Sequence, residues 1–531
     1  MPNPTGIAHG ATSKAVTLIS SWARALFLAG LAFNVLSHAE AAIINAASVS
    51  LADVTSAIAL ANDGDTVLLP AGTASWSSNL TVTKAITLQG AGIGQTIIKE
   101  NLSVDTQMLS FSTAAGKSYR VTAIEFQGGS RTTVFGKGML CWSGESRAVR
   151  VDHCRFDGIR NANIRTGESV CGVIDHNTFI LPANGAYALV VYHSTWNGNQ
   201  WGDGSWALAP NWGGSGAVYV EDNEFDNASS LGQLAICDQV GGARTVFRYN
   251  TFNNTYIDSH GTGSTARYRS WRHFEIYNNI FTDNPPSSTF CVDCRGGTGV
   301  FFNNKIYGTT KFLTLHTYRF WLDTGSWGGS DGTNGWDIND TTGGPNHDGI
   351  YLSGTAASGS TNLTLVVSGV AWTPDQWVGY SVKDTTPDST YPSGFFSICT
   401  GNTSNTITVA AGSNASNVTK PFTKGDQFEI RKVILSLDQP GAGTSDLLAD
   451  ETSITPTPVD LHQTIDPIYS WGNSVDDVAG AGDKTAAVTG SMVEGVHYIN
   501  GIARPGYTPY IYPHPLVSGT LAAPVNLRVV N

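Results

Sequence analysis

The stretch between residues 248 and 281 contains the densest group of side chains that can move protons or bind a charged substrate. Asp258 precedes His260 by two positions, which suits a carboxylate that orients an imidazole, and Arg267 and Arg269 would share one face of a strand. Removing a proton next to a carboxylate needs a base and a cation that neutralises the carboxylate. We therefore predict a catalytic group made of Asp238, Asp258, His260, Arg267, Arg269 and Arg272.

Other interpretations of this stretch stay open at this point. The arginines could instead pair with Asp258, Glu275 and Asp293 and hold a long loop in place. Asp238 and Asp258 would suit inverting hydrolysis if their carboxyl groups lie about 6.5–9.5 Å apart. Arg244 and Arg295 follow the acids of neighbouring repeats, and we expect both of them to bind substrate.

Aromatic residues provide a second candidate surface. Trp196, Trp201 and Trp206 lie in a segment rich in Gly and Asn, and flat rings on an exposed loop stack well on sugar faces. A small core inside the loop is the alternative. Tyr318 and Arg319 are expected to form the opposite wall of the same groove.

The elements that position these side chains form a repeat. Six segments share one pattern, and their last residues fall 23, 46, 27, 29 and 25 positions apart: VDHCRF (151–156), IDHNTF (174–179), VEDNEF (220–225), FRYNTF (247–252), IYNNIF (276–281) and FFNNKI (301–306). We interpret the interval of 46 as two turns of 23. A period of this length is typical of the coils of a parallel β-helix.

Two columns of the repeat carry polar residues. The fourth position is Asn in five segments, which predicts a stacked asparagine ladder in a turn. The outward second position begins with Asp152, Asp175 and Glu221. Acids one strand spacing apart repel each other unless a cation bridges them, and oxygen ligands suit calcium. We therefore expect these three acids to bind Ca²⁺, the alternative being that one acid is protonated or that the acids turn into water.

The seven cysteines also bear on the repeat. Their number is odd, so at least one is unpaired or pairs between chains. Cys141, Cys237 and Cys291 each lie 15 residues before the end of their segment, which predicts a buried column of thiols.

Flanking segments complete the predicted domain organisation. Residues 53–63 are expected to form a helix that covers the open end of the first coil, and residues 351–431 a small antiparallel β module. We expect a signal peptide at 1–41, a parallel β-helix at 42–340, an inserted β module at 341–432, and a C-terminal coil with an irregular tail packing on the β-helix at 433–531.

The N-terminus and the net charge limit the partners. Lys14 and Arg24 precede the apolar run 25–36, and Ala39-Glu40-Ala41 is typical of a cleavage site, so we expect secretion to the extracellular space without stable membrane insertion. A net charge of −12 disfavours nucleic acid as a partner. We expect a monomer.

Several motifs resemble one family. The segments GDTVLLPAG (64–72) and LTVTKAITLQGAG (80–92) resemble the opening of secreted right-handed parallel β-helix proteins of the pectate-lyase superfamily. VRVDHCRFDG (149–158) resembles a motif of that family whose Asp binds calcium, with Arg150 where an aromatic residue is usual. The stretch 248–281 is similar to later coils of the family, in which arginines act on a uronate.

The resemblance implies a polysaccharide lyase that cleaves an acidic, uronate-containing polysaccharide by β-elimination, with calcium as a cofactor. The Asp-Ser-His at 258–260 is also distantly similar to the Asp-Pro-His of alginate epimerases. The same scaffold carries inverting hydrolases, epimerases and non-catalytic glycan-binding or surface proteins, so these alternatives remain.

Overall fold

The computed structural model describes residues 41–183, 187–193, 210–227, 234–259, 270–316, 337–339, 350–378, 380–387, 395–409, 422–431, 433–436, 440–441, 466–487, 492, 494–518 and 529–530. The chain from Ala42 onwards forms one unit.

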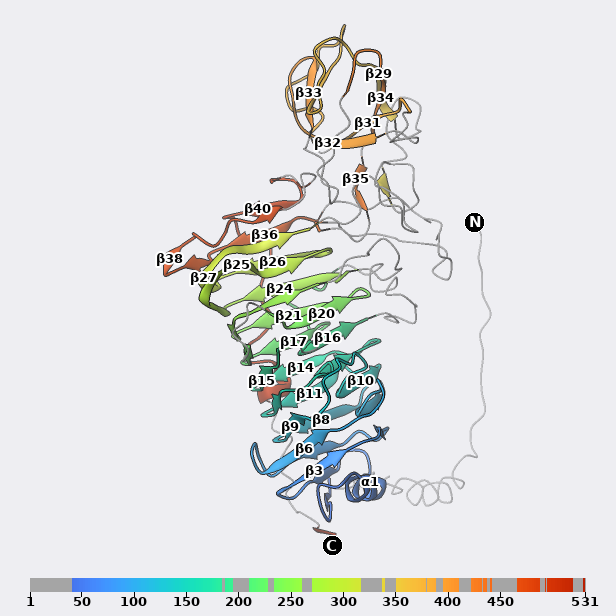
Figure 1. Cartoon of the computed structure of the whole chain (residues 1–531), viewed down its shortest axis with the longest axis vertical. Coiled ribbons are helices and arrows are strands. Elements are labelled where there is room, and N and C mark those ends of the chain that lie inside the picture. The colour runs from blue at the N-terminus through green and yellow to red at the C-terminus, as the bar shows by residue number, and fades with distance from the viewer. Residues whose placement is uncertain are drawn as a thin grey trace, which may run out of the picture. The chain divides into compact units, whose positions relative to one another are not determined.

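Three parallel sheets, called sheets A, B and C, are visited in turn by the chain, and each coil adds one strand to each sheet. The protein is a right-handed parallel β-helix, as predicted (Figure 1). Sheet A contains β1 (Ile43–Asn45), β2 (Thr66–Leu68), β5 (Thr87–Gln89), β8 (Ser118–Thr122), β11 (Ala148–Asp152), β14 (Gly172–Asp175), β17 (Val218–Glu221), β21 (Arg244–Arg248), β24 (His273–Tyr277), β26 (Thr298–Phe302), β36 (Ile468–Trp471) and β40 (Tyr498–Asn500), with β41 (Val529–Val530) beside β1.

Sheet B follows sheet A after a tight turn. It contains β3 (Gly72–Trp76), β6 (Thr96–Glu100), β9 (Glu125–Gly128), β12 (Arg155–Asp157), β15 (Thr178–Leu181), β18 (Glu224–Asn227), β22 (Thr251–Asn253), β25 (Ile280–Cys294), β27 (Lys305–Leu315), β37 (Ser474–Val475) and β38 (Val478–Ala479).

Sheet C closes each coil. It begins with β4 (Leu80–Val82), β7 (Leu109–Thr113), β10 (Leu140–Gly144), β13 (Ile164–Thr166), β16 (Leu189–Tyr192) and β20 (Cys237–Val240). Immediately before β20, the short β19 (Leu234–Ala235) pairs with β23 (Thr255–Asp258) of the next coil. Later coils add the second halves of β25 and β27, and β39 (Ala486–Ala487), and we count all of these with sheet C.

The turn from sheet A to sheet B explains the repeat. The first residue of this turn has a positive φ in each successive coil from His153 to Asn303, between 51° at His153 and 58° at Tyr249. The next residue is the predicted asparagine, whose Oδ1 accepts from the backbone N–H of the coil before it, as between Asn177 and Asn223 at 2.9 Å. The ladder is confirmed, and it continues from Asn304 to Asn473 at 3.0 Å.

The interior is a continuous apolar column. Aromatic rings from equivalent positions of sheet B stack on each other, with centroids 4.6–5.2 Å apart from Phe126 to Phe281. The helix α1 (Leu51–Leu60) lies beside the first coil, as predicted, and buries Val54, Ala57 and Ile58 (Figure 1). The helix begins two residues earlier than expected, because Ser50 caps it by accepting from the backbone N–H of Asp53. It also ends three residues earlier than expected, at Leu60.

Two details of the predicted repeat are wrong. β14 pairs directly with β17, with Asp175 opposite Glu221, so the interval of 46 residues is one coil with a long connection and not two coils of 23. The cysteines do not share one column, because Cys141 pairs with the outward Arg165 whereas Cys237 pairs with the inward Leu189. All seven cysteines are nevertheless buried and form no disulfide, so the prediction that Cys141, Cys237 and Cys291 are buried is confirmed.

The predicted antiparallel module is present, with its own apolar core. Its strands lie in the order β29-β34-β31-β32-β33-β30. They are β29 (Ile350–Thr355), β30 (Thr364–Val366), β31 (Ser381–Asp384), β32 (Phe395–Asn402), β33 (Thr406–Val409) and β34 (Gln427–Arg431). A separate antiparallel pair joins β28 (Asp337–Asn339) to β35 (Val433–Ser436), and a short helix, α3, spans Pro515–Ser518.

A search of the described ranges for membrane-spanning helices finds no helix with the length and apolarity that a span requires.

Candidate functional site

The outer face of sheet A carries two of the acids predicted to bind calcium, and arginines neutralise both. Asp152 accepts from Nε and Nη2 of Arg120, each at 2.6 Å. Asp175 accepts from Nε and Nη2 of Arg150, at 2.9 and 2.8 Å. Both carboxylates are fully buried, so these fork-shaped contacts supply the positive charge that a cation was expected to provide.

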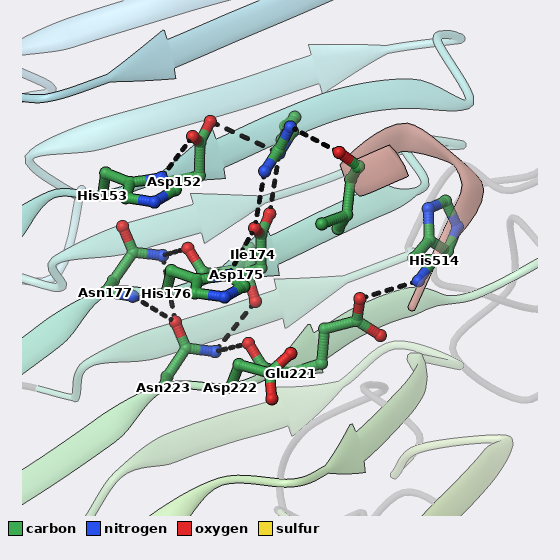
Figure 2. Close-up of polar contacts among 12 residues, drawn as sticks. Asp152, His153, Ile174, Asp175, His176, Asn177, Glu221, Asp222, Asn223 and His514 are labelled. Atoms are coloured by element: carbon green, nitrogen blue, oxygen red, sulfur yellow. Dashed lines mark hydrogen bonds and ion pairs between the residues drawn. The ribbon is translucent and has the colours of Figure 1, made fainter. Parts of the chain in front are cut away.

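Glu221, the third of these acids, is also paired. Arg248 donates from Nε to its Oε2 at 2.6 Å. The backbone N–H of His514 donates to its Oε1 at 2.8 Å (Figure 2). Arg248 further donates to the backbone carbonyls of Tyr510 and Ile511. Asp152, Asp175 and Glu221, the acids expected to bind calcium, are therefore each paired with an arginine, which leaves no repulsion for a cation to relieve.

A C-terminal segment, residues 505–518, covers this face of sheet A. Tyr507 donates to Glu275 at 2.5 Å, Tyr512 donates to Asp222 at 2.8 Å, and Arg150 donates to the carbonyl of Leu516 at 3.1 Å. The segment thus runs across several coils and covers the ion pairs of Asp175 and Glu221, whereas Arg120 beside Asp152 stays partly exposed.

Two arginines predicted to act on substrate are buried. Arg244 is 2% exposed in β21, and burial, with Arg147 nearby, lowers its pKa to about 10. Arg272 is fully buried immediately before β24. The assignment of Arg244 to substrate binding and of Arg272 to catalysis is wrong, because neither side chain reaches the surface.

The outer face of sheet C brings three aspartates together. Asp238 lies in β20, whose neighbour in the next coil is β23, and Asp258 ends β23. Asp258 is directly opposite Asp293 of β25 in the parallel register. Two predicted catalytic residues, Asp238 and Asp258, therefore lie in adjacent coils of one face, and Asp293 extends the group.

Arg295 and His316 complete this group. Arg295 places Nη2 3.2 Å from Oδ2 of Asp293 and Nε 3.6 Å from Oδ1 of Asp258, so it bridges two coils. The Nδ1 atom of His316 contacts Oδ1 of Asp293. The side chains of Arg295 and His316 remain 20% and 22% exposed, which leaves both accessible to a bound polymer.

Phenols surround the aspartates. Tyr192 donates to Oδ2 of Asp238 at 3.3 Å. Burial and the charges of Asp258 and Asp293 raise the pKa of Tyr256 to about 12, and burial with Asp238 raises that of Tyr187. These hydroxyls stay protonated at neutral pH, so they are proton donors rather than bases.

A groove of about 540 Å³ opens next to this group on the same sheet. Its lining includes Tyr187 and Tyr192, the cations Lys137 and Arg165, and the acids Asp105 and Asp238. The guanidinium of Arg165 stacks over the ring of Tyr192 at 4.6 Å. The groove therefore offers two cations and two phenols for a sugar acid, together with two carboxylates.

Several predicted site residues lie outside the described residues, and their assignments stay predictions. They are His260, Arg267, Arg269, Tyr318, Arg319, Trp196, Trp201 and Trp206.

Sequence reasoning missed His316, Tyr192 and Arg165. His316 lies beyond the last repeat segment, which ends at Ile306, so no repeat spacing linked it to Asp293. Arg165 and Tyr192 could have been found by aligning sheet C strands, because Arg165, Val190 and Asp238 are equivalent positions.

Within the described ranges there is no group of three or more His, Cys, Asp or Glu side chains arranged to hold a metal ion. At the aspartates of sheet C, Arg295 already occupies the space between Asp258 and Asp293. The residues present therefore do not fit the calcium ion that the family resemblance implies, and no catalytic step below depends on it.

No family model matches this sequence, and no curated protein matches it. Among solved structures, the PL6 family alginate lyase AlyGC is similar over 52% of this chain and 39% of its own length, at 20% identity and a TM-score of 0.34. An alginate lyase from Paenibacillus sp. str. FPU-7 is similar over 51% of this chain and 97% of its own length, at 14% identity and a TM-score of 0.22. ORF18 of Geobacillus virus E2 is similar over 72% of this chain and 78% of its own length, at 14% identity and a TM-score of 0.26.

This chain thus spans about two fifths of the length of the first of these proteins. At such identities and TM-scores, the fold is established by the strand pairing described above and not by these likenesses.

Proposed function

We propose that this protein is an exported enzyme that cleaves a uronate-containing polysaccharide by β-elimination on the outer face of sheet C. The observation that carries the proposal is the contact of His316 with Asp293, next to Arg295 and one end of a cation-lined groove. A polymer laid along the groove would meet a base, an acid and cations on one face.

The roles follow from the geometry. Asp293 accepts from Nδ1–H of His316, so Nε2 is the basic nitrogen and takes the proton from C5 of the uronate. The electron pair of that C–H bond forms the C4=C5 double bond while the C4–O4 bond breaks. The departing O4 takes a proton from a neighbouring phenol, for which Tyr256 and Tyr192 are the candidates.

Neutralising the uronate carboxylate makes the C5 proton more acidic. Arg165 and Lys137 line the groove and supply positive charge there. Arg295 is largely neutralised by Asp258 and Asp293, so its main task is to hold the two aspartates in place.

Inverting hydrolysis is the second candidate, favoured by the stack of Asp238, Asp258 and Asp293 on successive coils. With strands about 4.8 Å apart, adjacent acids are too close for inversion, whereas acids two coils apart fall at about 9.6 Å, near the upper limit. Asp238 with Asp293 would then be the acid–base pair.

The deciding experiment incubates the full chain with pectate, alginate and glucuronan, with and without a calcium chelator. The ultraviolet absorbance of the unsaturated product and the release of reducing ends are followed together. Equal growth of both signals is expected for elimination. Reducing ends without absorbance would establish the hydrolase, and polymer retention without either product would indicate a binding protein.

A further inference from the structure

A pair of exposed histidines lies on the turn between sheets A and B, away from the groove of sheet C. His153 and His176 follow Asp152 and Asp175, which are opposite each other in the strand register. Both histidines have a positive φ, and their rings stack with centroids 5.1 Å apart and planes 4° apart. Figure 2 shows both rings facing the same way from adjacent coils.

Each ring is held by the acid before it. The Nδ1 atom of His153 lies 2.7 Å from Oδ2 of Asp152, and that of His176 lies 2.9 Å from Oδ2 of Asp175 (Figure 2). An ionised carboxylate only accepts hydrogen bonds, so each Nδ1 carries the proton. Each Nε2 therefore presents its lone pair, and the side chains are 58% and 44% exposed.

Arginines hold both acids in place. Asp152 accepts from Nε and Nη2 of Arg120, each at 2.6 Å. Asp175 is held by two hydrogen bonds from Arg150. The tautomer of each imidazole is thus set by a carboxylate that cannot move, which is the arrangement found behind metal-binding histidines.

We propose that His153 and His176 form a binding site for a divalent transition-metal ion, with their two Nε2 atoms as protein ligands and water in the remaining positions. Imidazole nitrogens suit Zn²⁺, Cu²⁺ and Ni²⁺, whereas calcium prefers oxygen. Because the rings are stacked with nearly parallel planes, their Nε2 lone pairs point side by side, and bonds of about 2.0–2.1 Å to one ion require both rings to rotate towards each other. Rings about half exposed have room for this movement.

The next coil adds negative charge. Asp222 occupies the same turn position after Glu221, which is opposite Asp175. Its Oδ1 accepts from Tyr512, and its charge interacts with His176. A cation bound at the histidine pair is therefore favoured by this acid, although Asp222 itself need not be a ligand.

The test titrates the full chain with Zn²⁺ by calorimetry and with Cu²⁺ by electron paramagnetic resonance. Asparagine is the matched replacement, because Asn278 and Asn303 occupy the same turn position with positive φ. We expect His153→Asn and His176→Asn each to weaken Zn²⁺ binding at least about tenfold. The Cu²⁺ spectrum of the unchanged chain should show two equivalent nitrogens.

His347→Asn serves as a control for the other histidines of the chain and should leave binding unchanged. The midpoint of thermal unfolding without metal checks that each variant folds. Zn²⁺ should raise that midpoint for the unchanged chain and not for the double variant. The proposal would be overturned by a double variant that binds Zn²⁺ as well as the unchanged chain, or by a Cu²⁺ spectrum with one nitrogen.

Discussion

The outer faces of sheets A and C both carry acids at outward positions of successive coils, yet only one of them is suited to chemistry. On sheet A each acid has an arginine, and the C-terminal segment covers the pairs of Asp175 and Glu221. On sheet C two of the three aspartates, Asp258 and Asp293, share Arg295, and His316 stays accessible beside a groove. The comparison shows that a column of acidic residues is not enough to predict a catalytic site. The residues that pair with the acids and the segments that cover them must also be known.

The largest difference between the two faces should be in catalysis. Replacing His316 by Gln removes the proposed base, so the elimination rate should fall by about 10²–10⁴-fold. The measurement is product absorbance at saturating polymer. The matched control is Asp157→Asn, which breaks the partly exposed contact with Arg155 on sheet B and should leave the rate unchanged. A His316 variant with undiminished activity would remove sheet C from consideration.

A change on sheet A should instead cost stability. Arg248→Met leaves the charge of Glu221 buried without its partner, so the free energy of unfolding should drop by about 3–5 kcal/mol. Denaturant unfolding measures this drop, while activity per folded molecule should not change. Combining Arg248→Met with Glu221→Gln should recover part of the loss. A drop below about 1 kcal/mol would mean that this pair does not stabilise the face.

Acid should loosen the covering of sheet A. Burial and the charges of Arg248 and Arg150 lower the pKa of His514 to about 4, below its ordinary value of about 6.5. The folded state therefore favours neutral His514, and its contribution is complete above pH 6.5 and is lost as the pH falls from there towards 4. Tyr219, Tyr510 and Glu221 face the same ring or its backbone.

The corresponding measurement is the free energy of unfolding between pH 7 and pH 4. His514→Gln should reduce its slope by up to about 1.4 kcal/mol per pH unit, the limit for one proton. An identical slope in the variant would show that other groups cause the acid sensitivity.

The smallest effect is expected in the groove. Arg165→Leu removes one partly exposed cation next to Tyr192 while Lys137 remains in the groove, so KM for a polyuronate should rise about two- to fivefold and kcat should fall by less than KM rises. The rise should shrink at high salt, where exposed charges are screened. A large fall in kcat would instead place Arg165 at the reacting bond.

The repeat could be predicted because it obeys local rules. Asparagine after a residue with positive φ, and Phe at the end of the segment, each occur in five of the six segments and follow from strand spacing alone. The connection between β14 and β17 was misread because a period counts residues and cannot tell a long loop from an additional coil.

The partners of the acids could not be predicted in the same way. Arg150 reaches Leu516 across 366 positions, and Glu221 receives the N–H of His514 across 293. Such contacts depend on how the C-terminal segment returns along sheet A, which no periodicity encodes. Asp238 and Asp258 were found because they stand in strands of the repeat, whereas His316 was missed because it begins a long connection.

The asparagine ladder also bears on the order in which coils can form. Asn279 bonds to Asn304 across 25 positions, but Asn304 bonds to Asn473 across 169. Closing the longer loop costs about 1.7 kcal/mol more chain entropy, since each doubling of length adds about 0.6 kcal/mol. We therefore expect the coils before Asn304 to form one after another on the preceding coil. The coil that contains Asn473 is expected to form last and to unfold first.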